Sequence, residues 1–111
     1  MSNKLWAQIL LPTTDEAYSN SFGLAQDDTA ANFVVTGAFT GAEKATLQQY
    51  NPADETWTDV VFQGNNYFLD STTNTLGVWQ DWGTYRFHKE ATATAVGIVM
   101  QSANAGNSGG N

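Results

Sequence analysis

The chain has no cysteine and few basic residues: four Lys and Arg together, and a single His, among 111 residues. Without cysteine there can be no disulfide framework, thiol nucleophile or thiolate metal site. Eleven acidic residues against four basic ones give a net charge of −7, which opposes binding to a nucleic-acid backbone or to an anionic lipid surface. We therefore expect no nucleic-acid partner and no membrane partner.

Hydrophobic runs of signal-peptide length are also missing. The apolar stretch at residues 5–11 is too short for the core of a signal peptide, and no small-residue cleavage site follows it. We expect synthesis in the cytoplasm.

Apolar and aromatic residues occur instead in short segments. Hydrophobic residues make up 41% of the sequence, including four Trp, four Tyr and six Phe, which is enough for the single core that a chain of this length can bury. Turn residues recur about every 8 to 12 positions, and no segment shows a long 3.6-residue period. This spacing predicts an all-β fold, a single antiparallel β-sandwich of the immunoglobulin-like Greek-key type, with a jelly-roll-like sandwich as the alternative.

Alternation of apolar and polar residues predicts where the strands lie. A hairpin is expected where the alternation over residues 43–50 is followed by the turn sequence Asn-Pro-Ala-Asp and a returning strand. Residues 13–28 are polar and predict a long loop, with room for one short strand, that is a candidate interface segment. The expected strands are 5–11, 33–36, 43–50, 57–62, 67–69, 76–79, 85–88 and 96–101.

Residues 81–87, Asp-Trp-Gly-Thr-Tyr-Arg-Phe, have the order of an immunoglobulin-type tyrosine corner. In that motif a Tyr near the start of a late strand hydrogen-bonds to upstream backbone, two residues before a core position. The motif predicts a structural corner formed by Asp81, Gly83, Tyr85 and Phe87, with Phe87 in the core.

Reactive side chains are few. His88 alternates with Arg86, so we expect it on the outer face of its strand, and no nucleophile or orienting acid stands near it in a catalytic pattern. The acidic pairs Asp15-Glu16, Asp27-Asp28 and Asp54-Glu55 lack the spacing of a cation-binding loop. Asp27-Asp28 is the best candidate of the three, because a long loop could fold around an ion. We predict no enzyme activity, no cofactor and no metal site.

Two tryptophans are candidates for an exposed contact surface. Trp79 and Trp82 flank Gln80-Asp81, and the alternation around Trp79 favours its exposure. Exposed aromatic rings stack on sugars or anchor protein interfaces. We assign Trp79 and Trp82 as candidate interface or glycan contacts, and we expect Trp6 and Trp57 in the core.

The end of the chain, Ser-Ala-Asn-Ala-Gly-Asn-Ser-Gly-Gly-Asn, cannot build a core of its own. The expected organisation is a sandwich domain over residues 1–101, including an N-terminal strand, and a Gly- and Asn-rich tail over residues 102–111. Because such a tail buries little apolar surface on its own domain, Asn104 and Asn107 are candidate contacts to a neighbouring subunit.

Several pieces of residues 41–97 occur together: Leu-Gln at 47–48, Asn-Pro at 51–52, Trp-Thr-Asp-Val at 57–60 and Gly-Thr-Tyr-Arg-Phe-His-Lys at 83–89. In this combination the segment resembles short β-sandwich structural proteins of tailed bacteriophages. The resemblance covers about half of the chain.

The resemblance implies a non-enzymatic virion structural protein, made in the host cytoplasm and located in the virion. The best match is a capsid decoration or cement subunit on the outer surface of the phage head. The implied partner is the major capsid protein or another virion protein, and we expect a homo-oligomer. The rival hypothesis is a carbohydrate-binding module or host-glycan adhesin of a fibre or spike, which would use Trp79, Trp82 and calcium held by loop carboxylates.

Overall fold

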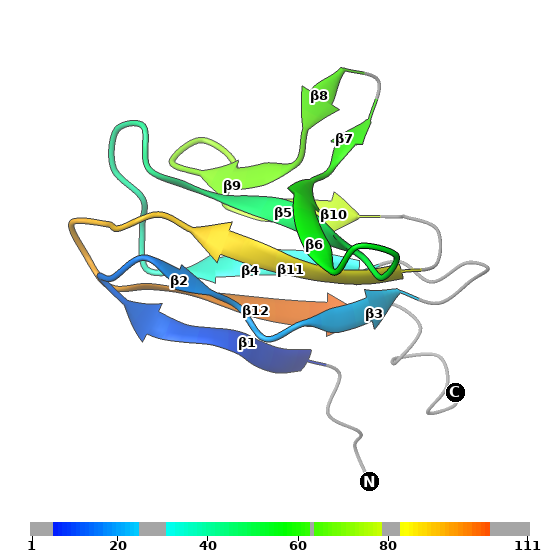
Figure 1. The fold of residues 1–111 in the computed structure, drawn as a ribbon. Coiled ribbons are helices and arrows are strands. Elements are labelled where there is room, and N and C mark those ends of the chain that lie inside the picture. Colours follow the sequence, from blue (N-terminus) through cyan, green and yellow to red (C-terminus); the bar gives the residue numbers. More distant parts are fainter. Residues whose placement is uncertain (1–5, 25–30, 63, 79–82, 103–111) are drawn as a thin grey trace, which may run out of the picture.

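The computed structural model describes residues 6–24, 31–62, 64–78 and 83–102 (Figure 1). Over these residues the chain forms antiparallel strands in two sheets, and a shared core joins them, so the predicted all-β sandwich is confirmed. The described part of the chain contains no helix that is long and apolar enough to cross a membrane.

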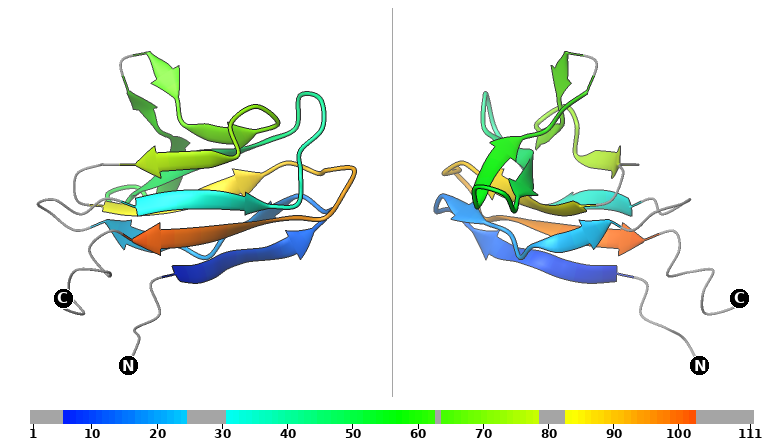
Figure 2. Two further views of the ribbon diagram at one scale, coloured as in Figure 1. Left: turned by 180° about the vertical axis from the view of Figure 1, so that it is seen from behind. Right: turned by 45° about the vertical axis from the view of Figure 1, so that its right-hand side comes forward.

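The two sheets lie against each other, and a small hairpin projects from them (Figures 1 and 2). Sheet A has the strand order β1 (Trp6–Thr13), β12 (Val96–Ser102), β4 (Ala31–Thr36) and β10 (Thr75–Val78). Sheet B has the order β2 (Ala17–Tyr18), β11 (Gly83–Lys89), β5 (Lys44–Asn51) and β6 (Thr56–Asp59), with β3 (Phe22–Leu24) also paired to β11 and β9 (Phe68–Asp70) also paired to β5. The projecting hairpin consists of β7 (Val61–Phe62) and β8 (Asn65–Asn66).

Followed inward from its two ends, the chain pairs like one long hairpin. β1 pairs with β12, β2 and β3 with β11, β4 with β10, and β5 with β6 and β9. A long hairpin rolled into two sheets is the jelly-roll arrangement. In an immunoglobulin domain the first strand lies beside the second, whereas here β1 lies beside β12. The strand order therefore follows the jelly-roll-like alternative and differs from the immunoglobulin-like expectation.

The core lies between the two sheets and is built around aromatic rings from both. The ring centre of Phe33 in β4 lies 4.9 Å from that of Phe22 in β3 and 4.9 Å from that of Phe87 in β11. Burying one such side chain contributes roughly 1.5–3 kcal/mol, so these contacts hold the sheets together. The buried hydrophobic residues are Ile9, Leu10, Phe22, Phe33, Phe39, Ala45, Leu47, Val60, Leu69, Tyr85, Phe87, Val96 and Ile98.

Period-two alternation decides which side chains of each strand enter this core. In β11, Tyr85, Phe87 and Lys89 are buried, while Arg86 and His88 alternate with them and are partly exposed on the outer face. The prediction that His88 lies on the outer face of its strand is thereby confirmed. β5 follows the same rule over its first half.

The edge strand β1 does not alternate regularly. Its register against β12 shifts on both sides of Leu10, so Ile9 and Leu10 are both buried, and Leu11 is 73% exposed. The strand lies close over Gly97, where an added Cβ would sit 2.6 Å from the Leu10 carbonyl oxygen. The expected strand at residues 5–11 is therefore present, but it does not bury all of its apolar residues. Bulges of this kind also make an edge strand a poor template for pairing with another chain.

The predicted tyrosine corner is only partly within the described residues. Tyr85 and Phe87 are buried as expected, and Gly83 opens β11. Asp81 lies outside the described residues. The hydrogen bond from the Tyr85 hydroxyl to upstream backbone stays a prediction.

Candidate functional site

The outer face of sheet A is free of charged side chains. None of its four strands contains Asp, Glu, Lys, Arg or His, although the chain as a whole carries fifteen charged residues, eleven acidic and four basic. Residues paired directly across a sheet point to the same side, so the register aligns Gln8, Val99, Val34 and Thr75 in one row across this face. Gln101, Asn32 and Gly77 form the next row. We call this surface the neutral face; it consists of Gln8, Asn32, Val34, Thr75, Gly77, Val99 and Gln101.

The neutral face is open to solvent and chemically suited to contact with protein. Asn32, Thr75, Gly77 and Gln101 are exposed, and the remaining members are partly exposed. Covering a charge with a partner requires its removal from water, which is costly unless the charge is paired. Amides and hydroxyls are cheaper to cover and can find hydrogen-bond partners across an interface.

The outer face of sheet B carries the opposite chemistry. The guanidinium carbon of Arg86 lies 4.0 Å from the ring centre of Tyr18 and 4.2 Å from that of Trp57. Arg86 Nε donates a hydrogen bond to Gln48 Oε1 at 2.8 Å, and Gln48 Nε2 donates to Asp59 Oδ1 at 3.1 Å. These contacts tie together β2, β11, β5 and β6, which are all the strands on the main path of the sheet.

The same cluster continues at both of its ends. The His88 ring stacks on Tyr18 with a centroid separation of 4.7 Å, and His88 Nε2 lies 2.6 Å from Glu16 Oε2. At the other end, Tyr50 packs on Trp57 at 5.1 Å. We call the set the aromatic ladder; it consists of Glu16, Tyr18, Gln48, Tyr50, Trp57, Asp59, Arg86 and His88.

The ladder corrects one expectation. Trp57 was expected in the core, but it is half-buried on the outer face of sheet B, because it pairs with Tyr50 in the β5–β6 hairpin and Tyr50 points away from Leu47. The alternation of β5 contained the signal, since it places Tyr50 on the outer face. The side chain of Trp6 lies outside what the structure describes.

Several acid–base groups of the described residues are engaged in structural contacts. His88 contacts Glu16, and no hydroxyl group of a described residue hydrogen-bonds to its ring. In the pair Asp54-Glu55, Asp54 Oδ1 accepts a hydrogen bond from the Thr56 hydroxyl at 2.6 Å. No cluster of three His, Cys, Asp or Glu residues suited to a metal ion occurs in the described part of the chain. The pair Asp27-Asp28 lies outside that part.

Lys89 is a buried cation that the sequence patterns did not single out. Its side chain follows Tyr85 and Phe87 inward, and Nζ donates to the carbonyl oxygens of Asp15 at 2.7 Å and Glu90 at 3.0 Å. Burial lowers the pKa of the Lys89 ammonium, and the carboxylates of Asp15 and Glu43 oppose that shift. Alternation along β11 predicts an inward Lys89 once Phe87 is assigned to the core.

Glu43 fastens the loops at the same end of the sandwich. Its Oε1 accepts a hydrogen bond from the Thr40 backbone N–H at 2.9 Å, and its Oε2 accepts one from the Ala93 N–H at 3.0 Å. The bond from Thr40 is the main cause that lowers the pKa of the Glu43 carboxyl. Together with Lys89, this carboxylate closes the end with structural contacts.

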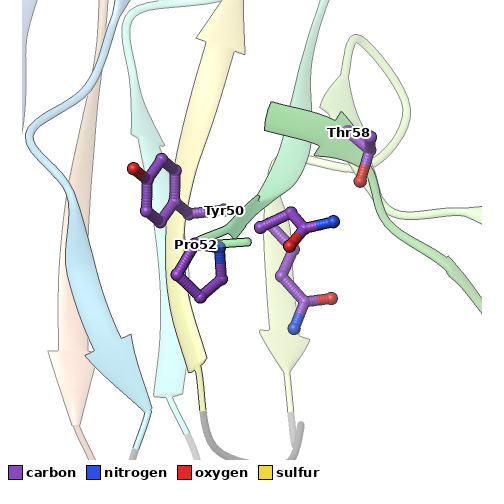
Figure 3. Close-up of a pocket in the computed structure, with 5 residues that line it drawn as sticks. Tyr50, Pro52 and Thr58 are labelled. Atoms are coloured by element: carbon purple, nitrogen blue, oxygen red, sulfur yellow. The ribbon is translucent and has the colours of Figure 1, made fainter. Parts of the chain in front are cut away.

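A shallow hollow of about 330 Å³ lies at the β5–β6 hairpin (Figure 3). Gln49 and Thr58 are paired across the two strands and so point to the same side, and Asn51 follows Gln49 on that side. Pro52 and Tyr50 complete the lining, and Figure 3 shows the Tyr50 ring pointing away from Thr58. All lining residues are uncharged.

The sequence predicts four contact residues. Trp79, Trp82, Asn104 and Asn107 all lie outside the described residues. The structure instead brings together two surfaces that no local motif marks, because strands far apart in the sequence supply them.

No family model matches the sequence, and no curated protein and no solved structure matches it.

Proposed function

We propose that the chain is a non-enzymatic structural subunit that binds other proteins in a larger assembly. The observation that carries this proposal is the neutral face, a four-stranded surface without charge on a chain of net charge −7. The resemblance of residues 41–97 to phage structural proteins indicates which kind of assembly this is. It favours a capsid decoration subunit on the outside of a phage head, with the major capsid protein or another virion protein as partner.

The distribution of charge favours an orientation in which sheet A faces the partner and sheet B faces solvent. The aromatic ladder on sheet B carries Arg86, His88, Glu16 and Asp59, which suits a face turned to solvent. The neutral face can be covered without loss of ion hydration. A jelly-roll sandwich is also an architecture used in capsid domains.

The size of the neutral face favours binding to assembled partners over binding to separate ones. The four strands have 8, 7, 6 and 4 residues. At a spacing of about 4.8 Å and a rise of about 3.3 Å per residue they cover roughly 400 Å². A standard interface buries about 800 Å² on each partner, so one such contact is weak. A subunit that also touches a second neighbour in the shell gains from effective concentration, and it then stabilises the shell by mass action.

The rival function in the form expected from the sequence, carbohydrate binding by aromatic rings that stack on sugars, would need free aromatic faces. In the ladder, Tyr18 contacts both Arg86 and His88, and Trp57 contacts both Arg86 and Tyr50. These contacts compete with a sugar for the rings. The ladder is therefore a weaker candidate for a sugar platform than for a stabilising element of sheet B.

Quantitative mass spectrometry of purified particles tests the proposal. We expect the chain in the particles at a fixed copy number relative to the major capsid protein. Its presence only in the soluble fraction, or at a copy number that varies between preparations, would refute the assignment to the virion.

A further inference from the structure

The hollow at the β5–β6 hairpin has a chemistry that the proposed structural role does not use. Gln49, Asn51 and Thr58 present two amides and one hydroxyl on the same side of the hairpin. Such groups both donate and accept hydrogen bonds. None of these lining residues is charged, so the hollow suits a ligand that is polar and neutral.

These polar groups are available to a ligand. No described residue forms a hydrogen bond with the Gln49 amide or the Thr58 hydroxyl. Asn51 Oδ1 accepts a bond from the Ala53 N–H at 2.9 Å, which fixes the Asn51 side chain and leaves its amide N–H groups free of partners among the described residues. The three side chains therefore project from a paired hairpin, and Asn51 is additionally held by its own hydrogen bond.

The surroundings exclude anions. Asp54 and Glu55 lie in the turn that joins β5 to β6, and the whole chain has a charge of −7. A phosphate or carboxylate ligand would be repelled at this position. A metal ion would find amide and hydroxyl groups but no carboxylate in the lining.

We propose that this hollow is a binding site for a neutral saccharide. Adjacent hydroxyls of a sugar match the paired donors and acceptors of Gln49 and Asn51, and Thr58 supplies a further hydroxyl partner. A volume of about 330 Å³ lies at the small end of the range for ligand sites, so the ligand is one or two sugar units. A peptide is a poorer match, because it would bind along the free edge of β6 through its backbone and not on the face of the hairpin.

The test is an NMR titration of the isotopically labelled protein with cellobiose, maltose and lactose as probes. We expect at least one of them to give saturable shifts at the Gln49 and Asn51 side-chain amides and at the Thr58 backbone amide. Triglycine should leave these signals in place. Absence of shifts with all three sugars, shifts located elsewhere, or equal shifts with triglycine would overturn the proposal.

Two matched substitutions locate the site. Thr58→Val removes one hydrogen-bonding group with little change in shape and should weaken binding about threefold to tenfold. Thr84→Val is the control, because Thr84 is also an exposed strand residue of sheet B but lies outside the hollow. Equal affinity of both variants would place the sugar elsewhere. The result is independent of particle assembly, so it can fail while the structural role stands.

Discussion

At the scale of single residues, Tyr85 is the first test of the local structure. Its ring is buried beside Phe22, and its hydroxyl is the polar group of the predicted corner. Tyr85→Phe removes only that hydroxyl and should lower the free energy of unfolding by about 1–2 kcal/mol. Urea denaturation measures the change. A midpoint equal to that of the wild type would show that the hydroxyl contributes no hydrogen bond of consequence.

Lys89 is the second residue whose role the structure makes testable. Lys89→Met keeps the aliphatic length but removes the donor to the Asp15 and Glu90 carbonyls. Two carbonyl groups then lose their donor. The free energy of unfolding of the variant should therefore be about 1–3 kcal/mol lower than that of the wild type at neutral pH. A variant as stable as the wild type would mean that removal of the buried charge offsets both lost bonds.

The pH dependence of Lys89 separates these two effects. Burial lowers the pKa of Lys89 in the folded protein below its usual value of 10.5. Between the lowered pKa and 10.5, the unfolded chain retains a proton that the folded chain has released, so the free energy of unfolding rises with pH in this window. The stability of the wild type relative to Lys89→Met should therefore increase as the pH is raised from neutral toward 10.5 and then level off. A relative stability that falls over this window would contradict burial as the dominant cause.

At the scale of elements, the aromatic ladder separates two kinds of aromatic residue. Phe33 lies in the core between the sheets, whereas Trp57 is half-buried on the outer face against Arg86. Phe33→Ala should cost about 3–5 kcal/mol because it leaves a cavity. Trp57→Ala should cost only about 1–2 kcal/mol, since it loses a cation–π contact and partial burial. Chemical denaturation of both variants measures the two changes. A larger loss of unfolding free energy for Trp57→Ala than for Phe33→Ala would contradict the placement of Trp57 on the outer face.

Elements with local signals were predictable from the sequence. The β5–β6 hairpin follows from period-two alternation and an Asn-Pro turn, and the Asn51 side chain does bond the backbone two residues on. β2 and β3 lie within the stretch expected as a loop with one short strand, because two- and three-residue strands leave almost no periodic pattern. The prediction for Trp57 is wrong because its size and apolarity favour the core, whereas its pairing with Tyr50 places it on the outer face.

The order of the strands was not predictable in the same way. Turn spacing and alternation fit an immunoglobulin-like sandwich and a jelly roll equally well, since both use short antiparallel strands. What distinguishes them is the pairing of β1 with β12, a contact between the two ends of the described chain. The neutral face depends on that same pairing, so no local motif could reveal it.

At the scale of the whole molecule, the sandwich has one face with charge and one without. Sheet B carries Arg86, His88 and Asp59 on its outer side, and sheet A carries no charged residue in any strand. A protein of net charge −7 repels acidic neighbours, and a contact through sheet A avoids placing a charge in the interface. The proposed attachment of the subunit to its neighbours therefore takes place through the neutral face.

The most direct measurement is the number of copies per particle for two charge variants, determined by quantitative mass spectrometry after assembly. Thr75→Glu places a charge in the neutral face, and Thr84→Glu places the same charge on the exposed outer side of sheet B. A buried unpaired charge costs several kcal/mol, so Thr75→Glu should lower the copy number about tenfold or more, while Thr84→Glu should match the wild type. Equal retention of both variants, or selective loss of Thr84→Glu, would contradict the neutral face as the attachment surface.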